Sequence, residues 1–78
     1  MRFDNIARQV HELRPELKAA GVRRACDQIA ARLREAPSPV LGVDLSAEVL
    51  APASGAYRDH AVEVGGAVLW LRVWLDCA

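Results

Sequence analysis

The chain has few aromatic residues, no excess of charge of either sign and no long apolar run. One phenylalanine, one tyrosine and two tryptophans occur among its 78 residues. Ten basic and ten acidic residues cancel, so the chain lacks the net positive charge typical of nucleic-acid-binding proteins and the acidic excess of a DNA mimic. A hydrophobic share of 53% nevertheless suits a folded globule and argues against intrinsic disorder.

Cysteine is also scarce. Cys26 and Cys77 are too few for the disulfide framework of a small secreted domain. The sequence begins MRFDNIARQV, without the apolar run of a signal peptide, and no later stretch approaches the length that crosses a bilayer. We therefore expect reduced cysteines in a cytoplasmic protein, with Cys26 in the core and Cys77 free. No metal-ligand spacing links these cysteines to His11 or His60, so we expect no metal and no cofactor.

The first half of the chain has the apolar spacing of two helices. Residues three or four apart form one stripe: Phe3, Ile6, Val10, Leu13 and Leu17. Because Pro15 disfavours a continuous helix, we expect a helix over 3–13, followed by a turn that Gly21 closes. A second stripe predicts a helix from residue 22 or 23 to about 35, ended by the prolines at 37 and 39: Val22, Cys26, Ile29 and Leu33.

The apolar period then changes to two, which is typical of half-buried strands. Residues 40–50, VLGVDLSAEVL, alternate and place five side chains on one predicted face: Leu41, Val43, Leu45, Ala47 and Val49. Two more strand-like runs flank Gly65 and Gly66, a pair typical of a two-residue hairpin turn. That turn sets a register in which Asp59 opposes Arg72 and Tyr57 opposes Trp74, both favourable cross-strand pairs.

These elements predict one α+β domain over residues 1–78, in the order α-α-β-β-β. We expect an N-terminal helical pair, within residues 3–36, to pack on one face of a three-stranded antiparallel β-meander, within residues 40–76. Two helices are enough to cover one face of such a sheet. The other face should then be left open.

The last predicted strand contains both tryptophans, as WLRVW over residues 70–74. Alternation turns Leu71 and Val73 toward the helices. The other three side chains of this stretch, Trp70, Arg72 and Trp74, then point to the open face. Tryptophan, tyrosine and arginine dominate the energetics of protein interfaces, so we expect this face to bind a protein partner. A second copy of the chain is the simplest partner, and simple packing of the tryptophans is the alternative. The expected binding residues are Trp70, Arg72, Trp74, Tyr57 and Asp59.

A second class of function, DNA binding, is suggested by the predicted helices. The segment 15–35 has the outline of a helix-turn-helix, in which Arg23 and Arg24 open the second helix and would contact the nucleic acid. Pro15 shortens the first helix, and Asp27 stands where such motifs place a buried aliphatic residue. A helical hairpin with a solvated basic face is therefore favoured, and a small DNA-binding regulator is the alternative.

Enzyme chemistry is the third class. Tyr57, Arg58 and His60 resemble residues used by small ribonuclease toxins, but the rest of that pattern is missing. The sequence has no phosphate-binding loop and no Ser-His-Asp order, so it predicts no catalytic residue. We expect a non-catalytic interaction module that acts as an accessory regulator or inhibitor, a group that includes proteins carried by phages and other mobile elements.

Overall fold

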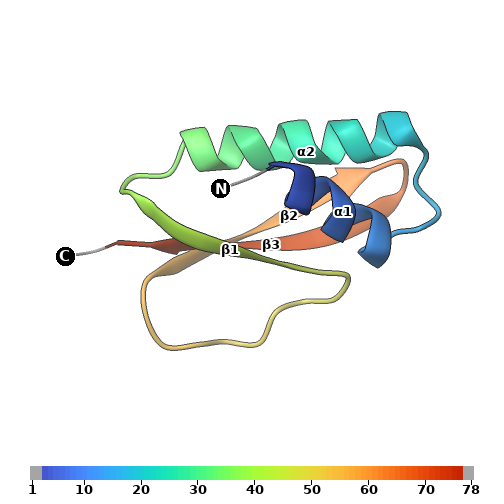
Figure 1. Cartoon of the computed structure of the whole chain (residues 1–78). Coiled ribbons are helices and arrows are strands. Elements are labelled where there is room, and N and C mark those ends of the chain that lie inside the picture. The colour runs from blue at the N-terminus through green and yellow to red at the C-terminus, as the bar shows by residue number, and fades with distance from the viewer. Residues whose placement is uncertain (1–2, 77–78) are drawn as a thin grey trace.

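The computed structural model describes residues 3–76, with side chains from residue 5 onward, as two helices packed on a three-stranded sheet. This is the predicted α+β fold in the predicted order. Figure 1 shows both helices on one face of the sheet, while the loop of residues 47–56 sweeps past the opposite face. Cys77 and the side chain of Phe3 lie outside the described residues. The elements are α1 (Phe3–Leu13), α2 (Ala19–Arg34), β1 (Val40–Ser46), β2 (Tyr57–Val64) and β3 (Ala67–Leu75).

The helices follow their apolar stripes, with one difference from the prediction. α1 ends at Leu13, just before Pro15, as the sequence predicts. α2, however, starts at Ala19, so Gly21 lies in its first turn instead of closing a loop. A Cβ atom added to Gly21 would lie 3.3 Å from a Leu17 methyl carbon and 3.6 Å from Val64. The glycine therefore leaves room for the Leu17 side chain against the first turn of α2, while a Cβ atom there would meet Val64 only at an ordinary contact distance.

The strand order is β1-β3-β2, which corrects the expected meander. Both outer strands run antiparallel to β3 and hence parallel to each other, so the loop of residues 47–56 must cross from one edge of the sheet to the other. Consecutive strands are usually neighbours, and the prediction relied on that tendency. The sequence of β3, AVLWLRVWL, is nonetheless the most continuously apolar of the three, which suits a central strand, whereas charged residues suit the edges.

β1 departs from its predicted face at both ends. The register shifts between Val40, which pairs with Leu75, and Gly42, which pairs with Trp74, so Leu41 is the extra residue of a bulge and is 71% exposed. The strand then stops at Ser46, whose Oγ accepts a hydrogen bond from the backbone N–H of Glu48 at 3.0 Å. Ala47 and Val49 therefore fall outside the strand, and only Val43 and Leu45 of the predicted face pack on the core.

The β2–β3 hairpin has the register predicted from its two glycines. Tyr57 pairs with Trp74, Asp59 with Arg72, and the ladder continues without a bulge to Val64 and Ala67. Gly65 and Gly66 have φ values of 58° and 81°, in the left-handed region that a tight two-residue turn requires and that other residues rarely adopt.

The core lies between the helices and the inward face of the sheet. Cys26 is half-buried against it, and burial, with a smaller effect of Asp27, raises the pKa of its thiol. The guanidinium of Arg14 links the segment after α1 to the sheet, since it donates to the carbonyl oxygens of Val68 (2.6 Å) and Ala47 (3.0 Å). The buried apolar residues are Ile6, Val10, Ala25, Ile29, Val62, Val64, Leu69, Leu71, Val73 and Leu75.

Two leucines provide a matched test of this packing. Leu71→Ala, at a side chain with no exposure, should lower the free energy of unfolding by ~2–5 kcal/mol, because it removes buried methyl groups and leaves a cavity. Leu41→Ala, at the bulge, should change it by no more than ~0.5 kcal/mol. Urea unfolding of both variants measures the difference. Equal destabilisation would mean that β1 has the unbulged register predicted from its alternation.

Candidate functional site

The sheet face turned away from the helices, here called the outer face, contains the five residues predicted to bind a partner. Trp70, Arg72 and Trp74 alternate along β3 with buried Leu71 and Val73, as expected for a strand. Because β3 is central, each of the three has a neighbour on both sides. The outer-face residues of the flanking strands are Gly42, Asp44 and Ser46 on β1, and Tyr57, Asp59, Ala61 and Glu63 on β2.

Arg72 is buried at only 4% exposure, although no helix covers it. Its Nε and Nη2 donate to the two carboxylate oxygens of Asp59 at 2.8 and 2.9 Å, a bidentate geometry. Its guanidinium carbon also lies 4.0 Å from the ring centroid of Tyr57 and 5.7 Å from that of Trp74. The sequence placed Arg72 on the correct face but as a displayed charge. Its aromatic neighbours and Asp59 instead enclose it.

Trp74 connects β3 to both neighbouring strands on the outer face. Its indole Nε1–H donates to Oδ2 of Asp44 at 2.8 Å, which links β3 to β1. Its ring meets that of Tyr57 edge-on, with centroids 5.2 Å apart and planes at 61°. Arg72, Asp59, Tyr57, Trp74 and Asp44 thus form one connected group of side chains across all three strands, here called the arginine–aromatic cluster.

The loop of residues 47–56, here called the crossing loop, packs against this cluster. The backbone N–H of Ala53 donates to the Tyr57 hydroxyl oxygen at 3.1 Å. Gly55 has a φ of 110°, and a Cβ atom there would lie 3.3 Å from a carbon of the Trp74 ring. Glycine is therefore required at residue 55 both by the backbone conformation and by the closeness of the ring. The sequence of residues 51–56, APASGA, is that of an ordinary turn and does not show which side chain the loop covers.

The ion pair in the cluster changes the titration of both partners. The hydrogen bond from Arg72 lowers the pKa of Asp59 below its ordinary value. Burial opposes this lowering in part, and the nearby charges of Arg72 and His60 add to it. The same hydrogen bond raises the pKa of Arg72. The pair is therefore fully charged at neutral pH. Arg72 has its partner within the chain and offers few free donors to an incoming protein.

Trp70 differs from Trp74. It lies between Ala61 and Ser46 on the neighbouring strands and is half-buried. Within the described residues its indole N–H has no hydrogen-bond partner, and it is not among the buried polar atoms. The ring therefore keeps one free donor facing solvent. Among the residues predicted from the sequence, Trp70 is the one best placed to contact another molecule.

The residues of the other two function classes lie elsewhere. Arg23 and Arg24 are exposed on α2, and this helix packs on the face of the sheet opposite to the outer face (Figure 1). Tyr57 is separated from Arg58 and His60, because neighbouring residues of β2 point to opposite faces of the sheet. Tyr57 belongs to the arginine–aromatic cluster, whereas Arg58 and His60 lie on the helix side. The three do not converge on one site.

Residues 3–76 contain neither a cluster of metal ligands nor a helix that could span a membrane. No group of three His, Cys, Asp or Glu side chains is close enough there to hold a metal ion. Neither α1 nor α2 is long and apolar enough to span a bilayer.

Comparison with protein-family models, with curated proteins and with solved structures found no match to this chain. Any function proposed for it therefore depends on its own residues.

The Asp59–Arg72 pair predicts a dependence of stability on pH. A carboxyl whose pKa is lower in the folded state adds stability above its unfolded pKa of ~3.9, and this is lost as the pH falls through the folded value. Asp59→Asn should therefore be less stable than the wild type at pH 7, and its stability should fall less steeply below pH ~4. Urea unfolding at several pH values measures both effects.

Glu63→Gln is the matched control, since Glu63 is an exposed carboxylate of the same strand and face, with no ion pair to a described residue. It should keep the stability of the wild type at pH 7. If Asp59→Asn behaved like this control, the ion pair would not hold the outer face together.

Proposed function

We propose that this protein is a non-catalytic protein–protein interaction module, an accessory regulator or inhibitor that binds its partner through the outer face around Trp70. The observation that supports this best is the contrast between the two tryptophans. Trp74 has its indole N–H bonded to Asp44, while Trp70 exposes part of its ring and a free donor on the face without helices. An aromatic ring with a polar group at its edge is a frequent anchor of protein interfaces.

Preorganisation also supports this function. The arginine–aromatic cluster joins the three strands on the face that contains Trp70, and its Tyr57 also accepts a hydrogen bond from the crossing loop, so its bonds are complete within the chain. Binding then requires little ordering of side chains, which is one of the main free-energy costs of association. Half-buried Val68 and exposed Ala61 extend the apolar area around Trp70.

The charges around Trp70 indicate the chemistry of the partner. The outer face and the loop that continues it contain four carboxylates and one guanidinium: Asp44, Glu48, Asp59, Glu63 and Arg72. Because Arg72 is buried in its pair with Asp59, the exposed rim is acidic. A partner with lysine or arginine around an apolar recess would complement this surface. We therefore propose a basic-rimmed protein as the partner.

A second copy of the chain was the partner expected from the sequence, and salt distinguishes it from a basic protein. Stacking two outer faces about a two-fold axis would bring the two acidic rims together, so this association should strengthen as salt screens their repulsion. Binding of a basic partner should weaken with salt instead. Sedimentation of the pure chain at low and high salt should therefore show the 8.5 kDa monomer at low salt. A dimer already stable at low salt would contradict the acidic-rim argument.

Site-specific photo-cross-linking tests the binding face directly. A photoreactive amino acid in place of Ala61 lies beside Trp70 on the outer face, and one in place of exposed Ala20 lies on α2. In the native host we expect a discrete adduct from position 61 and none from position 20. Adding Trp70→Ala should abolish the adduct while the protein stays folded, since such an anchor contributes ~2 kcal/mol or more to binding.

Other outcomes would assign the function elsewhere. An adduct from position 20 alone would place the binding surface on the helices. Retention of duplex DNA, lost in Arg23→Ala and Arg24→Ala, would favour the helix-turn-helix alternative. An adduct at position 61 that is unchanged by Trp70→Ala would remove the tryptophan from the interface.

A further inference from the structure

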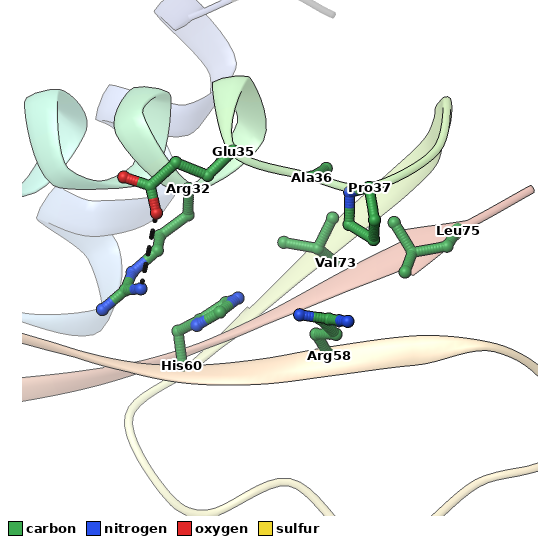
Figure 2. A pocket seen from close by; sticks show the side chains of 8 residues that line it. All are labelled: Arg32, Glu35, Ala36, Pro37, Arg58, His60, Val73 and Leu75. Carbon is green, nitrogen blue, oxygen red and sulfur yellow. Dashed lines mark ion pairs between the residues drawn. The ribbon is translucent and has the colours of Figure 1, made fainter.

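A small pocket opens on the helix side of the sheet, away from the outer face. It has a volume of about 90 Å³ and lies where α2 ends above the start of β2 and the end of β3 (Figure 2). The lining divides into a charged mouth and an apolar floor. The mouth comprises Arg32, Glu35, Arg58 and His60, and the floor comprises Ala36, Pro37, Val73 and Leu75.

The pocket exists because the sheet extends further than the helix that covers it. α2 runs antiparallel to β2, since Gly21 in its first turn lies near Val64 at the end of β2, whereas Arg32 near its last turn lines the pocket with the residues at the start of β2. The helix ends at Arg34 and Pro37 turns the chain away. The first residues of β2 and their partners on β3 therefore lie beside the end of the helix, where the almost fully buried side chains of Val73 and Leu75 form the floor of the pocket.

The charges at the mouth are only partly neutralised. Arg32 forms an ion pair with Glu35 at 3.7 Å, which leaves that guanidinium partly compensated. Arg58 is exposed and forms no hydrogen bond or ion pair with any described residue. Figure 2 shows Arg58 and His60 rising from β2 toward the end of α2, with the Arg32–Glu35 pair beyond His60. Arg58 thus has free donors next to the apolar floor.

We propose that this pocket binds a carboxylate attached to a small apolar body, with Arg58 holding the carboxylate and Val73, Leu75 and Pro37 contacting the body. A volume of this size accommodates on the order of three or four heavy atoms, which is enough for a branched alkyl group whose carboxylate stays at the mouth. Glu35 and the negative end of the α2 dipole disfavour a doubly charged phosphate, which would also leave the apolar floor without contacts. A singly charged acid with a branched alkyl group satisfies both halves of the lining.

His60 couples this binding to pH. Burial lowers the pKa of its imidazole, and the positive charges of Arg32 and Arg58 lower it further against smaller opposing effects of Glu35 and Asp59. β3 adds only apolar residues to the pocket. A carboxylate bound beside Arg58 would offset the two guanidinium groups and raise the pKa of His60. By linkage, the affinity for the carboxylate should then increase as the pH falls through the range in which His60 titrates.

NMR titration of the full chain with isobutyrate tests the proposal. We expect saturable shifts at Arg58, His60 and Val73 and a higher pKa for His60 in the presence of ligand. Isobutyramide, the neutral isostere, and inorganic phosphate should both bind about tenfold more weakly or worse, since each lacks half of the recognised chemistry. Absence of saturable shifts, or tighter binding of phosphate, would overturn the proposal.

Two arginine variants provide the matched control. Arg58→Met keeps the apolar stem but removes the charge and should weaken isobutyrate binding about tenfold. Arg34 is exposed at the end of α2 but does not line the pocket, so Arg34→Met should leave isobutyrate binding unchanged. Equal effects of the two variants would reduce the role of Arg58 to general electrostatics and contradict the assignment.

The carboxylate could belong to a free acid or to the last residue of a peptide chain. A short peptide ending in valine, compared with the same peptide as its C-terminal amide, distinguishes these sources. Binding of the free-acid peptide more tightly than isobutyrate assigns the pocket to a chain terminus, and weaker binding assigns it to a small free acid.

Discussion

β3 pairs with both other strands, so the alternation of its side chains decides what each face of the sheet can be. Leu69, Leu71, Val73 and Leu75 point to the helices and are buried there. The residues between them point to a face that no helix covers. A central strand has backbone hydrogen bonds on both sides, so its outward side chains always have neighbours on two strands. This placement allows Arg72 to be enclosed by side chains of the sheet itself.

The outer face therefore works as a second, polar core. A buried guanidinium is costly unless its donors are satisfied, and here Asp59 satisfies two of them while Tyr57 and Trp74 cover the planar group. The chain has only four aromatic residues, and two of them serve this purpose. Trp74 is thus committed to the fold, and Trp70 remains available to another molecule.

Local chemistry made much of this structure predictable. The α1 boundary followed from Pro15, and the hairpin register followed from the two glycines, because a two-residue turn leaves one pairing of the strands. The non-local features were not predictable. Strand order depends on which strand best tolerates burial on both faces, and the bulge at Leu41 depends on pairing with a partner more than thirty residues away. Alternation alone shows neither.

In the candidate site, too, local features were predictable from the sequence and features that depend on distant segments were not. The sequence placed Trp70, Arg72 and Trp74 on one face, which requires only the period of a strand. It did not show that Arg72 is buried or that Gly55 packs on Trp74, since both depend on a loop that crosses the sheet. The pocket at Arg58 was missed for a similar reason. It arises from a difference in length between α2 and the sheet below it, which becomes visible only when the helix is laid across the strands.

The β1-β3-β2 order also constrains the sequence of events as the chain folds. β1 and β2 are made first, but neither pairs with the other, so no part of the sheet can form until residues 67–75 have left the ribosome. The β2–β3 hairpin closes through a two-residue turn and can form quickly, whereas β1 must join it across a much longer span of chain. Nascent chains that end before β3 therefore have two unpaired strands and no template for either.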